Sequence, residues 1–382
     1  INNNVSINFY ASAGNLVEGN NFVDGSVGVV LDACNGPNNF RNNNMTNDGY
    51  NLIVWGSSLE AFMQNIDTSN IANNRTIYYI TDSHNLMLNP INCPYIGYLA
   101  LVNCTEVTVK DIDLSNRKDG MLMVQSTNCR LINITLANAR TKIILGGFSS
   151  QPIIHGGLAF FKSDNNLMAN SRITNNSVGV CLYQSSGNLF YHNSFFEIDE
   201  PVISNFRSPA LPPSGSYSMN KWDSNYEGNY WSNYNGIDSF SGSYQNVSGS
   251  DGIGDTPHFV DANNTDHYPL VGTFSIFNTS LGYNVDVISN STIEDFEHFE
   301  SNGTIKMHVS SMTANQTFGF VRICIPHALM NETYQVTING AEPYYINYTL
   351  YDNSTHRWIY FSYQHSTLEI VIVPEFHSFI IM

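Results

Sequence analysis

Charge is scarce in this sequence, and positive charge is the scarcer sign. Charged residues make up 12% of the 382 residues, and 32 acids against 15 bases give a formal net charge of -17. No basic stripe exists to neutralise phosphates, which argues against nucleic acid and anionic lipid as partners. Cations, neutral glycans, other surface proteins and further copies of the chain remain as partners.

No apolar run reaches transmembrane length, and no signal peptide opens the chain. The sequence starts at Ile1 inside an Asn-rich, repeat-like stretch, from which we expect a processed or truncated N-terminus. Residues 375–382 end in an apolar run that we interpret as the start of a lost membrane anchor. A membrane would then be reached only through a C-terminal anchor that this chain does not contain.

The six cysteines include no C-x-x-C pair, which argues against zinc-binding and thioredoxin-like sites. Cys93, Cys104 and Cys129 fall in neighbouring repeats. We expect them either to contribute one disulfide or to stack as small buried thiols. Sequence alone leaves the disulfide pairing open.

A degenerate repeat of roughly two dozen residues is the strongest internal signal. In each copy an Asn precedes an apolar residue, and a second Asn with its own apolar neighbour follows a few positions later. The copies begin at Asn15, Asn39, Asn166 and Asn188. Apolar and polar residues alternate within the copies, which predicts short strands with one buried face.

These repeats predict a right-handed parallel β-helix over residues 1–205, because stacked coils bury a core that no single coil can bury. Asn at the corners tolerates left-handed backbone and bonds to local amides. A leucine-rich repeat is the competing fold, but its helical half is absent. Residues 51–100 interrupt the rhythm and are expected to form a longer excursion within the helix, with short strands of their own.

Two further regions follow the repeats. Residues 206–272 are rich in aromatic residues, Asp and Gly, and are expected to form a loop-rich cap over the end of the solenoid. Alternation returns over residues 273–374 in about seven short strands, which predicts an immunoglobulin-like β-sandwich. The predicted fold class is therefore all-β: a parallel β-helix, a cap and a sandwich.

Several motifs resemble the NosD-like β-helix family. The most specific are Gly228-Asn229-Tyr230-Trp231-Ser232-Asn233-Tyr234 and Asp251-Gly252-Ile253-Gly254-Asp255-Thr256-Pro257. The resemblance covers roughly residues 1–272. The region 273–374 and the motif Val373-Pro374-Glu375-Phe376 resemble archaeal surface proteins of this family, in which a membrane anchor follows that motif.

The resemblance implies a right-handed parallel β-helix with carbohydrate-binding or sugar-hydrolase-like ancestry. The family's founding member is a periplasmic protein that helps to insert copper into nitrous oxide reductase. Copper delivery needs soft ligands, yet the sequence has no His-x-His or Met-x-x-Met tract. Met121, Met123 and Cys129 lie within one coil, but their alternation with apolar neighbours favours core packing. We therefore do not expect copper.

Catalysis on a β-helix needs carboxylates or a basic residue gathered on one sheet face. The catalytic candidates are Asp111, Asp113 and Arg117 in the densest charged segment, with Arg130 on the next coil. Alternation predicts that the two aspartates point the same way. A solvated face with ion pairs between coils explains the same residues and is the favoured interpretation.

A calcium site is a second chemical hypothesis. Asp251, Asp255, Asp261 and Asp266 lie close in sequence on a glycine-containing loop, and hard carboxylate oxygens suit Ca²⁺. The spacing does not match an EF-hand loop. Asx turns that cap a loop would use the same residues and are the alternative to an ion. A calcium ion bound here would have a structural role.

Aromatic residues make up 13% of the chain, and Trp222, Tyr230 and Trp231 crowd one segment. Exposed, these rings would stack on sugars; buried, they would close the end of the solenoid. Burial is the favoured interpretation.

Fifteen N-x-S/T sequons favour an exported glycoprotein. The acceptor candidates are Asn74, Asn103, Asn133, Asn246, Asn263, Asn278, Asn290, Asn302, Asn315, Asn331, Asn347 and Asn353.

The leading hypothesis is a non-catalytic extracellular or cell-surface β-helix protein. Its role would be structural, adhesive or glycan- or protein-binding, with self-assembly into a homo-oligomer open. The first alternative is a carbohydrate-active β-helix enzyme, either a polysaccharide lyase or a hydrolase. The second is a periplasmic copper-handling protein like the founding family member.

Overall fold

The computed structural model describes residues 5–46, 49–117, 119–139, 157–204, 218–313, 315–330, 333–364 and 367–374. The chain divides into two compact units. The first comprises residues 1–224 and 259–266, and the second comprises residues 225–258 and 267–382. The predicted cap, residues 206–272, is thus shared between the units. The predicted tail, residues 375–382, lies outside the described residues.

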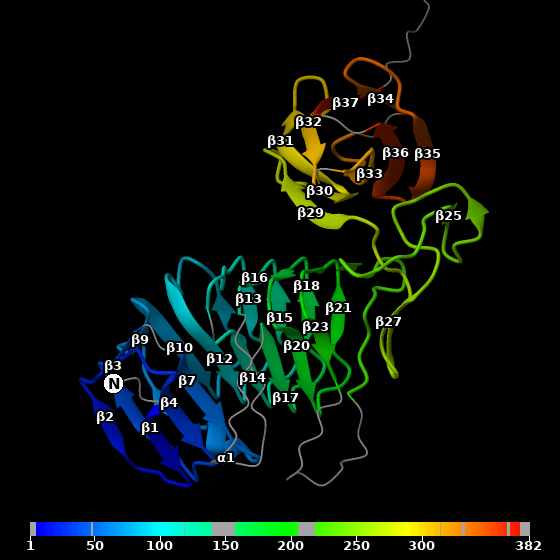
Figure 1. Ribbon diagram of the computed structural model, residues 1–382. Coiled ribbons are helices and arrows are strands. Elements are labelled where there is room, and N and C mark those ends of the chain that lie inside the picture. Colours follow the sequence, from blue (N-terminus) through cyan, green and yellow to red (C-terminus); the bar gives the residue numbers. More distant parts are fainter. Residues whose placement is uncertain are drawn as a thin grey trace, which may run out of the picture. The chain divides into compact units, whose positions relative to one another are not determined.

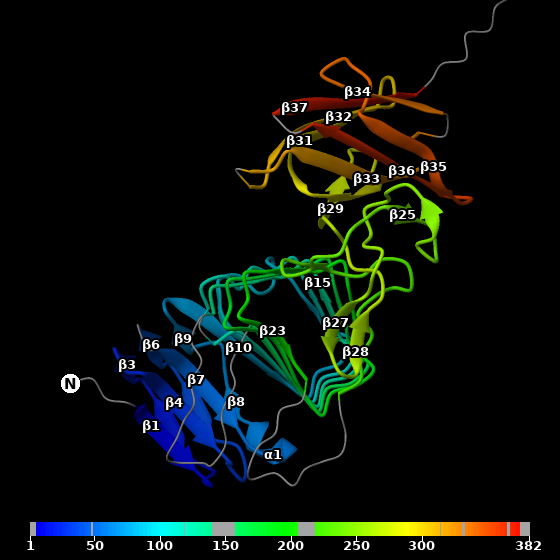
Figure 2. The ribbon, with the colours of Figure 1, turned by 45° about the vertical axis from the view of Figure 1, so that its right-hand side comes forward.

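The first unit is a parallel β-helix of about eight turns, as the repeats predict (Figures 1 and 2). Its longest sheet has nine strands: β3 (Asn21–Val23), β6 (Asn44–Thr46), β9 (Ile71–Ala72), β10 (Arg75–Thr81), β12 (Ile96–Val102), β14 (Met121–Val124), β17 (Leu158–Phe161), β20 (Val178–Tyr183) and β23 (Glu200–Ile203). All these pairings are parallel except the short hairpin of β9 and β10.

Shorter sheets form the other walls of the coils. One contains β1 (Val5–Tyr10), β4 (Val27–Asp32) and β7 (Tyr50–Trp55), and another contains β2 (Leu16–Glu18), β5 (Asn39–Arg41) and β8 (Asn65–Ile66). A five-stranded sheet contains β11 (Met87–Leu88), β13 (Thr108–Lys110), β15 (Arg130–Ile132), β18 (Leu167–Ala169) and β21 (Leu189–Tyr191). The strands β16 (Thr135–Ala137), β19 (Arg172–Thr174) and β22 (Ser194–Phe196) stack beside it.

The central strands of the long sheet are buried on both faces. Tyr98, Ala100 and Val102 share one core cluster with Leu31 and Val54 of the first coils. The alternate side chains of β12 are buried as well. Parallel strands with two buried faces carry near-continuous apolar runs, which explains why β12 and β14 show no polar alternation.

Internal amide ladders run through the coils and satisfy buried backbone donors. Oδ1 of Asn188 accepts hydrogen bonds from the backbone N–H of Asn166 at 2.8 Å and from its Nδ2 at 3.1 Å. In the same way, Oδ1 of Asn220 accepts hydrogen bonds from the backbone N–H and from Nδ2 of Asn188. An unsatisfied buried N–H costs about 1–3 kcal/mol, so each rung stabilises its coil. These asparagines therefore bond between coils, and not only to local amides as predicted.

Pairing in the first coils is offset by one residue from the repeat alignment that the sequence suggests. The sequence pattern aligns Asn15 with Asn39, but the structure pairs Leu16 with Asn39 and Val17 with Phe40. The internal ladder accordingly joins Asn15 to Asn38, at 3.2 Å between the backbone nitrogen and Oδ1. Consecutive Asn residues make such a slip invisible in the sequence.

Residues 51–100 contribute strands to the coils and are only briefly interrupted. β7 pairs with β4, and β8 pairs with β5. Between them lies α1 (Leu59–Phe62), a single helical turn whose Phe62 is buried. No helix among the described residues is long and apolar enough to cross a membrane.

The six cysteines are all buried free thiols, which answers the open question of pairing for this structure. Cys104 occupies a column otherwise held by serines. Its backbone N–H donates to Ser126 Oγ at 3.0 Å, and Ser126 donates in the same way to Ser163 at 3.1 Å. A small residue with a weak donor thus suits the column.

A returning hairpin closes the C-terminal end of the ladders. It consists of β27 (His258–Asp261) and β28 (Asn264–Asp266). Oδ1 of Asn264 accepts from the backbone N–H of Asn220 at 2.9 Å and from Trp222 Nε1 at 3.2 Å. The hairpin therefore provides the last rung, which explains why residues 259–266 belong to the first unit.

The second unit contains two antiparallel sheets that share one core. The five-stranded sheet orders β29 (Thr273–Asn278), β30 (Asn284–Ser289), β33 (Phe318–Pro326), β36 (His356–Gln364) and β35 (Tyr345–Asp352). The four-stranded sheet orders β31 (Ser291–Phe299), β32 (Thr304–Ser311), β37 (Leu368–Pro374) and β34 (Tyr334–Ile338). We call residues 273–374 the two-sheet domain; its layers are those expected of a β-sandwich.

Candidate functional site

The predicted catalytic aspartates occupy turn positions on the coils. Asp111 follows β13 with a φ of 58°, and its Oδ1 accepts from Asn133 Nδ2 at 2.8 Å. Asp113 Oδ1 accepts from the backbone N–H of Ser115 at 2.7 Å, as in an Asx turn. Each carboxylate therefore has a structural role in its own turn.

The predicted cationic partners lie elsewhere on the same coils. Arg117 Nε donates to the backbone carbonyl of Ile96 at 3.0 Å, and burial lowers the pKa of its guanidinium. Arg130 begins β15 and is exposed. Among the described residues, no hydrogen bond or ion pair joins either arginine to Asp111 or Asp113. The structure thus brings the four candidates onto neighbouring turns without joining them into one catalytic group.

The predicted calcium ligands are divided between the units. Asp261 belongs to the first, where it accepts from Asn264 Nδ2 and hydrogen-bonds Ser204. Asp266 also belongs to the first unit and is fully buried. Asp251 and Asp255 belong to the second. Within the described ranges, no group of three or more His, Cys, Asp or Glu side chains is arranged to hold a metal ion.

In the second unit, the aspartates cap the backbone of a tight loop. Asp255 accepts from the N–H groups of Ser239 and Phe240 at 3.0 and 3.1 Å. Asp238 accepts from those of Asp251 and Gly252 at 2.9 and 2.8 Å. Burial raises the pKa of Asp238 to about 7. These bonds reach 13 to 16 residues along the chain. The Asx turn that the sequence offered as the alternative to calcium occurs at Asp251, whose Oδ1 accepts from the N–H of Ile253 at 3.0 Å.

The two most specific motifs interlock around Tyr234. Its hydroxyl donates to the carbonyl of Thr256 at 2.6 Å. A Cβ on Gly236 or Gly254 would lie 2.0 or 2.1 Å from that hydroxyl oxygen. Both positions therefore require glycine because the tyrosine passes directly beside their backbone.

The rings predicted to stack on sugars are mostly internal. Trp222 and Trp231 are 0% and 1% exposed. Trp222 stacks on Phe190, with ring centroids 4.3 Å apart, inside the first unit. Tyr230 is half-buried and packs against the cluster around Ile253 in the second unit. Both tryptophans are therefore core residues, as the favoured interpretation expects, and the alternative of glycan stacking on them is wrong.

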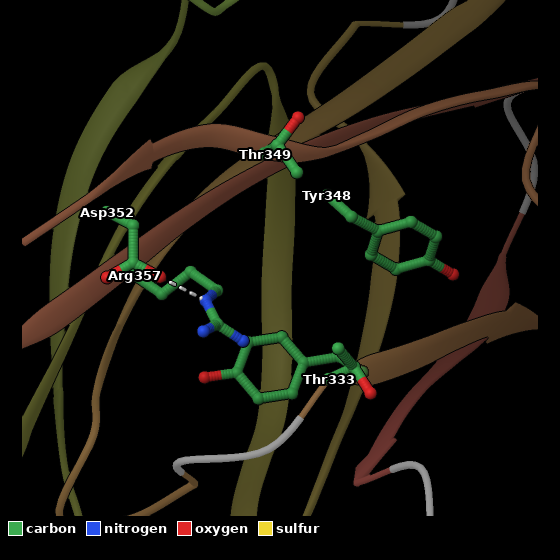
Figure 3. A pocket seen from close by; sticks show the side chains of 6 residues that line it. Thr333, Tyr348, Thr349, Asp352 and Arg357 are labelled. Carbon is green, nitrogen blue, oxygen red and sulfur yellow. Dashed lines mark hydrogen bonds and ion pairs between the residues drawn. The ribbon is translucent and has the colours of Figure 1, made fainter.

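A pocket that the sequence did not reveal opens in the two-sheet domain (Figure 3). Its volume is about 320 Å³. The lining residues come from β34, β35, β36 and the segment before β34: Thr333, Tyr334, Tyr348, Thr349, Asp352 and Arg357. Figure 3 shows the Asp352–Arg357 pair on one side of the pocket and Tyr348 on the other.

The charged pair is held in one orientation. Arg357 Nε lies 2.6 Å from Asp352 Oδ2, and His327 Nε2 lies 3.0 Å from Oδ1. The Arg357 guanidinium also lies over the Tyr334 ring, 5.3 Å from its centroid. The hydrogen bond from Arg357 lowers the pKa of Asp352, which keeps an ionised acceptor next to a fixed donor.

The aromatic residues of the pocket are fixed by their hydroxyls. Tyr334 donates to the carbonyl of Met330 at 2.5 Å, and burial raises the pKa of Tyr334 to about 12. Tyr348 accepts from the backbone N–H of Val336 at 3.1 Å. The one sequence signal for this site is the adjacency of Asp352 and Arg357 across a short polar turn between aromatic strands.

The sequons occupy several environments. Most of their Asn side chains are exposed, including Asn74, Asn246, Asn263, Asn278, Asn302 and Asn315. Asn290 is partly buried, and its side chain bonds to the backbone of Phe318 and Phe320. Asn331 lies outside the described residues.

The stacked coils define the class: the first unit is that of a parallel β-helix protein. Within it and extending into the second unit, residues 99–236 match a family model described as "Periplasmic copper-binding protein (NosD)". The chain therefore carries a NosD-like parallel β-helix, as the motifs predict. No curated protein and no solved structure matches the chain.

Four soft-ligand residues in the described part of the matched segment are core residues. Met121 and Met123 are 1% and 0% exposed, and both belong to a strand buried on every residue. Burial raises the pKa of Cys129 to about 11 and that of Cys181 to about 12. Thiols of this kind stay protonated, whereas the metal ligand is the thiolate. These four residues therefore do not fit a copper site.

Proposed function

We propose that this chain is a non-catalytic extracytoplasmic β-helix protein whose two-sheet domain binds a glycan. The β-helix acts as a rigid support, and the pocket beside Asp352 and Arg357 is the ligand site. The family model's periplasmic description supports a location outside the cytoplasm. The low charge and the many amide side chains are compatible with partners that are neutral sugars.

The observation that carries this proposal is the fixed pair of Asp352 and Arg357 beside the partly buried ring of Tyr348 in one pocket. An ionised acceptor and a guanidinium donor 2.6 Å apart present complementary groups to the neighbouring hydroxyls of one sugar ring. Tyr348 offers a ring face for the apolar side of the same sugar. Small polar–aromatic pockets of this size fix a ligand's orientation with few contacts.

The proposal is tested by glycan-array binding of the purified full chain, followed by calorimetry with the best ligand. Asp352→Asn keeps the shape but removes the charged acceptor, and we expect at least about tenfold weaker binding, because a hydrogen bond to a charged group contributes about 1.5–3 kcal/mol. Glu369→Gln is the matched control, since it breaks a surface ion pair with Lys306 and neither residue lines the pocket. Its affinity should match that of the unmodified chain.

Three results would overturn the proposal. The first is an array without a bound glycan, and the second is unchanged affinity in Asp352→Asn. The third is turnover of a polysaccharide that is lost in Asp111→Asn or Asp113→Asn, which would favour the enzyme alternative. If the same pocket bound proline-rich peptides and no sugars, the proposed glycan ligand would be wrong and a peptide would take its place.

A further inference from the structure

The sequons can be divided into two kinds by which atom of the asparagine side chain, Oδ1 or Nδ2, makes the hydrogen bonds. Asn353 is exposed at the turn between β35 and β36. Its Oδ1 accepts from the N–H and hydroxyl of Thr355 at 2.8 and 3.0 Å, and from the N–H of His356 at 2.8 Å. No hydrogen bond from its Nδ2 to another described residue occurs.

Two sequons on the coils, at Asn103 and Asn133, have the opposite arrangement. Nδ2 of Asn103 donates to Asp82 Oδ1 at 2.6 Å, and Nδ2 of Asn133 donates to Asp111 Oδ1 at 2.8 Å. Both asparagines have left-handed backbone, with φ of 55° and 52°. Their amide nitrogens are thus part of a ladder that joins successive coils.

We propose that Asn353 is an acceptor for an N-linked glycan and that Asn103 and Asn133 are not. In the transfer, Nδ2 of the asparagine forms a bond to the anomeric carbon of a lipid-phosphate-linked oligosaccharide. The bond from that carbon to the phosphate oxygen breaks, the lipid phosphate leaves, and one Nδ2 proton passes to a base of the transferase. The asparagine must therefore expose its nitrogen and release a proton.

Electrostatics favour this step at Asn353 and oppose it on the coils. Three donors at Oδ1 stabilise negative charge on the amide, because hydrogen bonds to the charged form favour that form. At Asn103 and Asn133 a carboxylate faces the nitrogen, so loss of a proton would place two negative charges together. Asn347 resembles Asn353, since its Oδ1 accepts from the N–H of Thr349 at 3.0 Å and from its hydroxyl at 3.3 Å, although Asn347 is partly buried.

The order of folding gives the same preference. The turn at Asn353 is closed by neighbours in sequence, since Asp352 pairs with Arg357. The contacts of Asn103 and Asn133 reach 21 and 22 residues along the chain. Local hairpins form before contacts of that range, so the acceptor geometry is present early.

The test is site occupancy, measured by peptide mass mapping of the full chain secreted from a eukaryotic host that N-glycosylates. We expect glycan on Asn353 and bare Asn103 and Asn133. Asn353→Gln should lower the intact mass by one glycan, whereas Asn103→Gln should leave the glycan mass unchanged. Equal occupancy of all three sites, or a bare Asn353, overturns the proposal. The readout does not depend on ligand binding at the pocket, although Asp352 adjoins the turn.

Discussion

The Oδ1 atom of Asn264 accepts a hydrogen bond from the backbone N–H of Asn220 at 2.9 Å, across 44 residues of sequence. The chain leaves the β-helix, builds part of the second unit, and returns with one hairpin to complete the helix end. The end of a solenoid needs such a cover because its last coil would otherwise expose core and backbone donors.

The first prediction concerns this last rung. Asn264→Ala leaves the N–H of Asn220 and the indole N–H of Trp222 without their shared acceptor, and we expect a loss of about 2–4 kcal/mol. Urea unfolding followed by tryptophan fluorescence measures it. Asn263→Ala is the control, since that side chain is exposed. Equal midpoints for the two variants would contradict the role of Asn264 as a cap.

The second prediction separates two buried cysteines. Cys104 holds a position in a serine column, and its Sγ lies 3.5 Å from the carbonyl of Val102. Cys104→Ser should therefore change the free energy of unfolding by less than about 1 kcal/mol. Cys181 is also buried, and its partners on the two adjoining strands are the apolar residues Ala159 and Ile203, so Cys181→Ser should cost about 1–3 kcal/mol for a buried hydroxyl. Thermal unfolding of both variants checks the order.

The third prediction concerns the interlocked motifs. Gly254→Ala would bring a Cβ within 2.1 Å of the Tyr234 hydroxyl, so the loop must move and residues 228–258 should exchange amide hydrogens faster. The double variant Gly254→Ala with Tyr234→Ala removes the clash, and its added cost over Tyr234→Ala should be small. Strict additivity of the two changes would show that the contact is unimportant.

The sequence carries the fold class because coil-to-coil contacts repeat at a nearly fixed spacing. Asn166 and Asn188 are visible as a repeat for that reason, and the structure joins them by a ladder bond. One face of β12, formed by Tyr98, Ala100 and Val102, packs against residues of the first coils. The sequence cannot show this packing, because it joins segments far apart in the chain. The slip at Asn38 and Asn39 is hidden for a similar reason, since either asparagine satisfies the pattern.

The candidate pocket was beyond sequence reasoning because it depends on long-range pairing. Tyr334 and Asp352 belong to different sheets. Arg357 reaches both, through a hydrogen bond to Asp352 and by lying over the Tyr334 ring. By contrast, Trp222 and Trp231 were conspicuous in the sequence because large rings are rare, yet large rings are also what a core needs. The composition therefore identifies the aromatic segment, but it does not show which of its rings are exposed to solvent.

The last prediction is a pH dependence of the second unit. Burial raises the pKa of Asp238 to about 7 from its ordinary value of 3.8. Between these values the folded chain retains a proton that the unfolded chain has released. Stability must therefore fall as the pH rises from about 4 to about 7, and it levels off above that range. Burial also raises the pKa of Asp251, which adds to the same slope.

Asp238→Asn tests the origin of this slope. The amide cannot ionise, so the variant should show a flatter dependence between pH 4.5 and 7.5, although its overall stability falls because an acceptor of one backbone N–H is lost. Asp295→Asn is the control, since that side chain is 83% exposed. Urea midpoints for the two variants and the unmodified chain, followed by near-ultraviolet circular dichroism, measure the effect. A slope that persists in Asp238→Asn, or a stability that rises with pH, would show that Asp238 does not govern the loop.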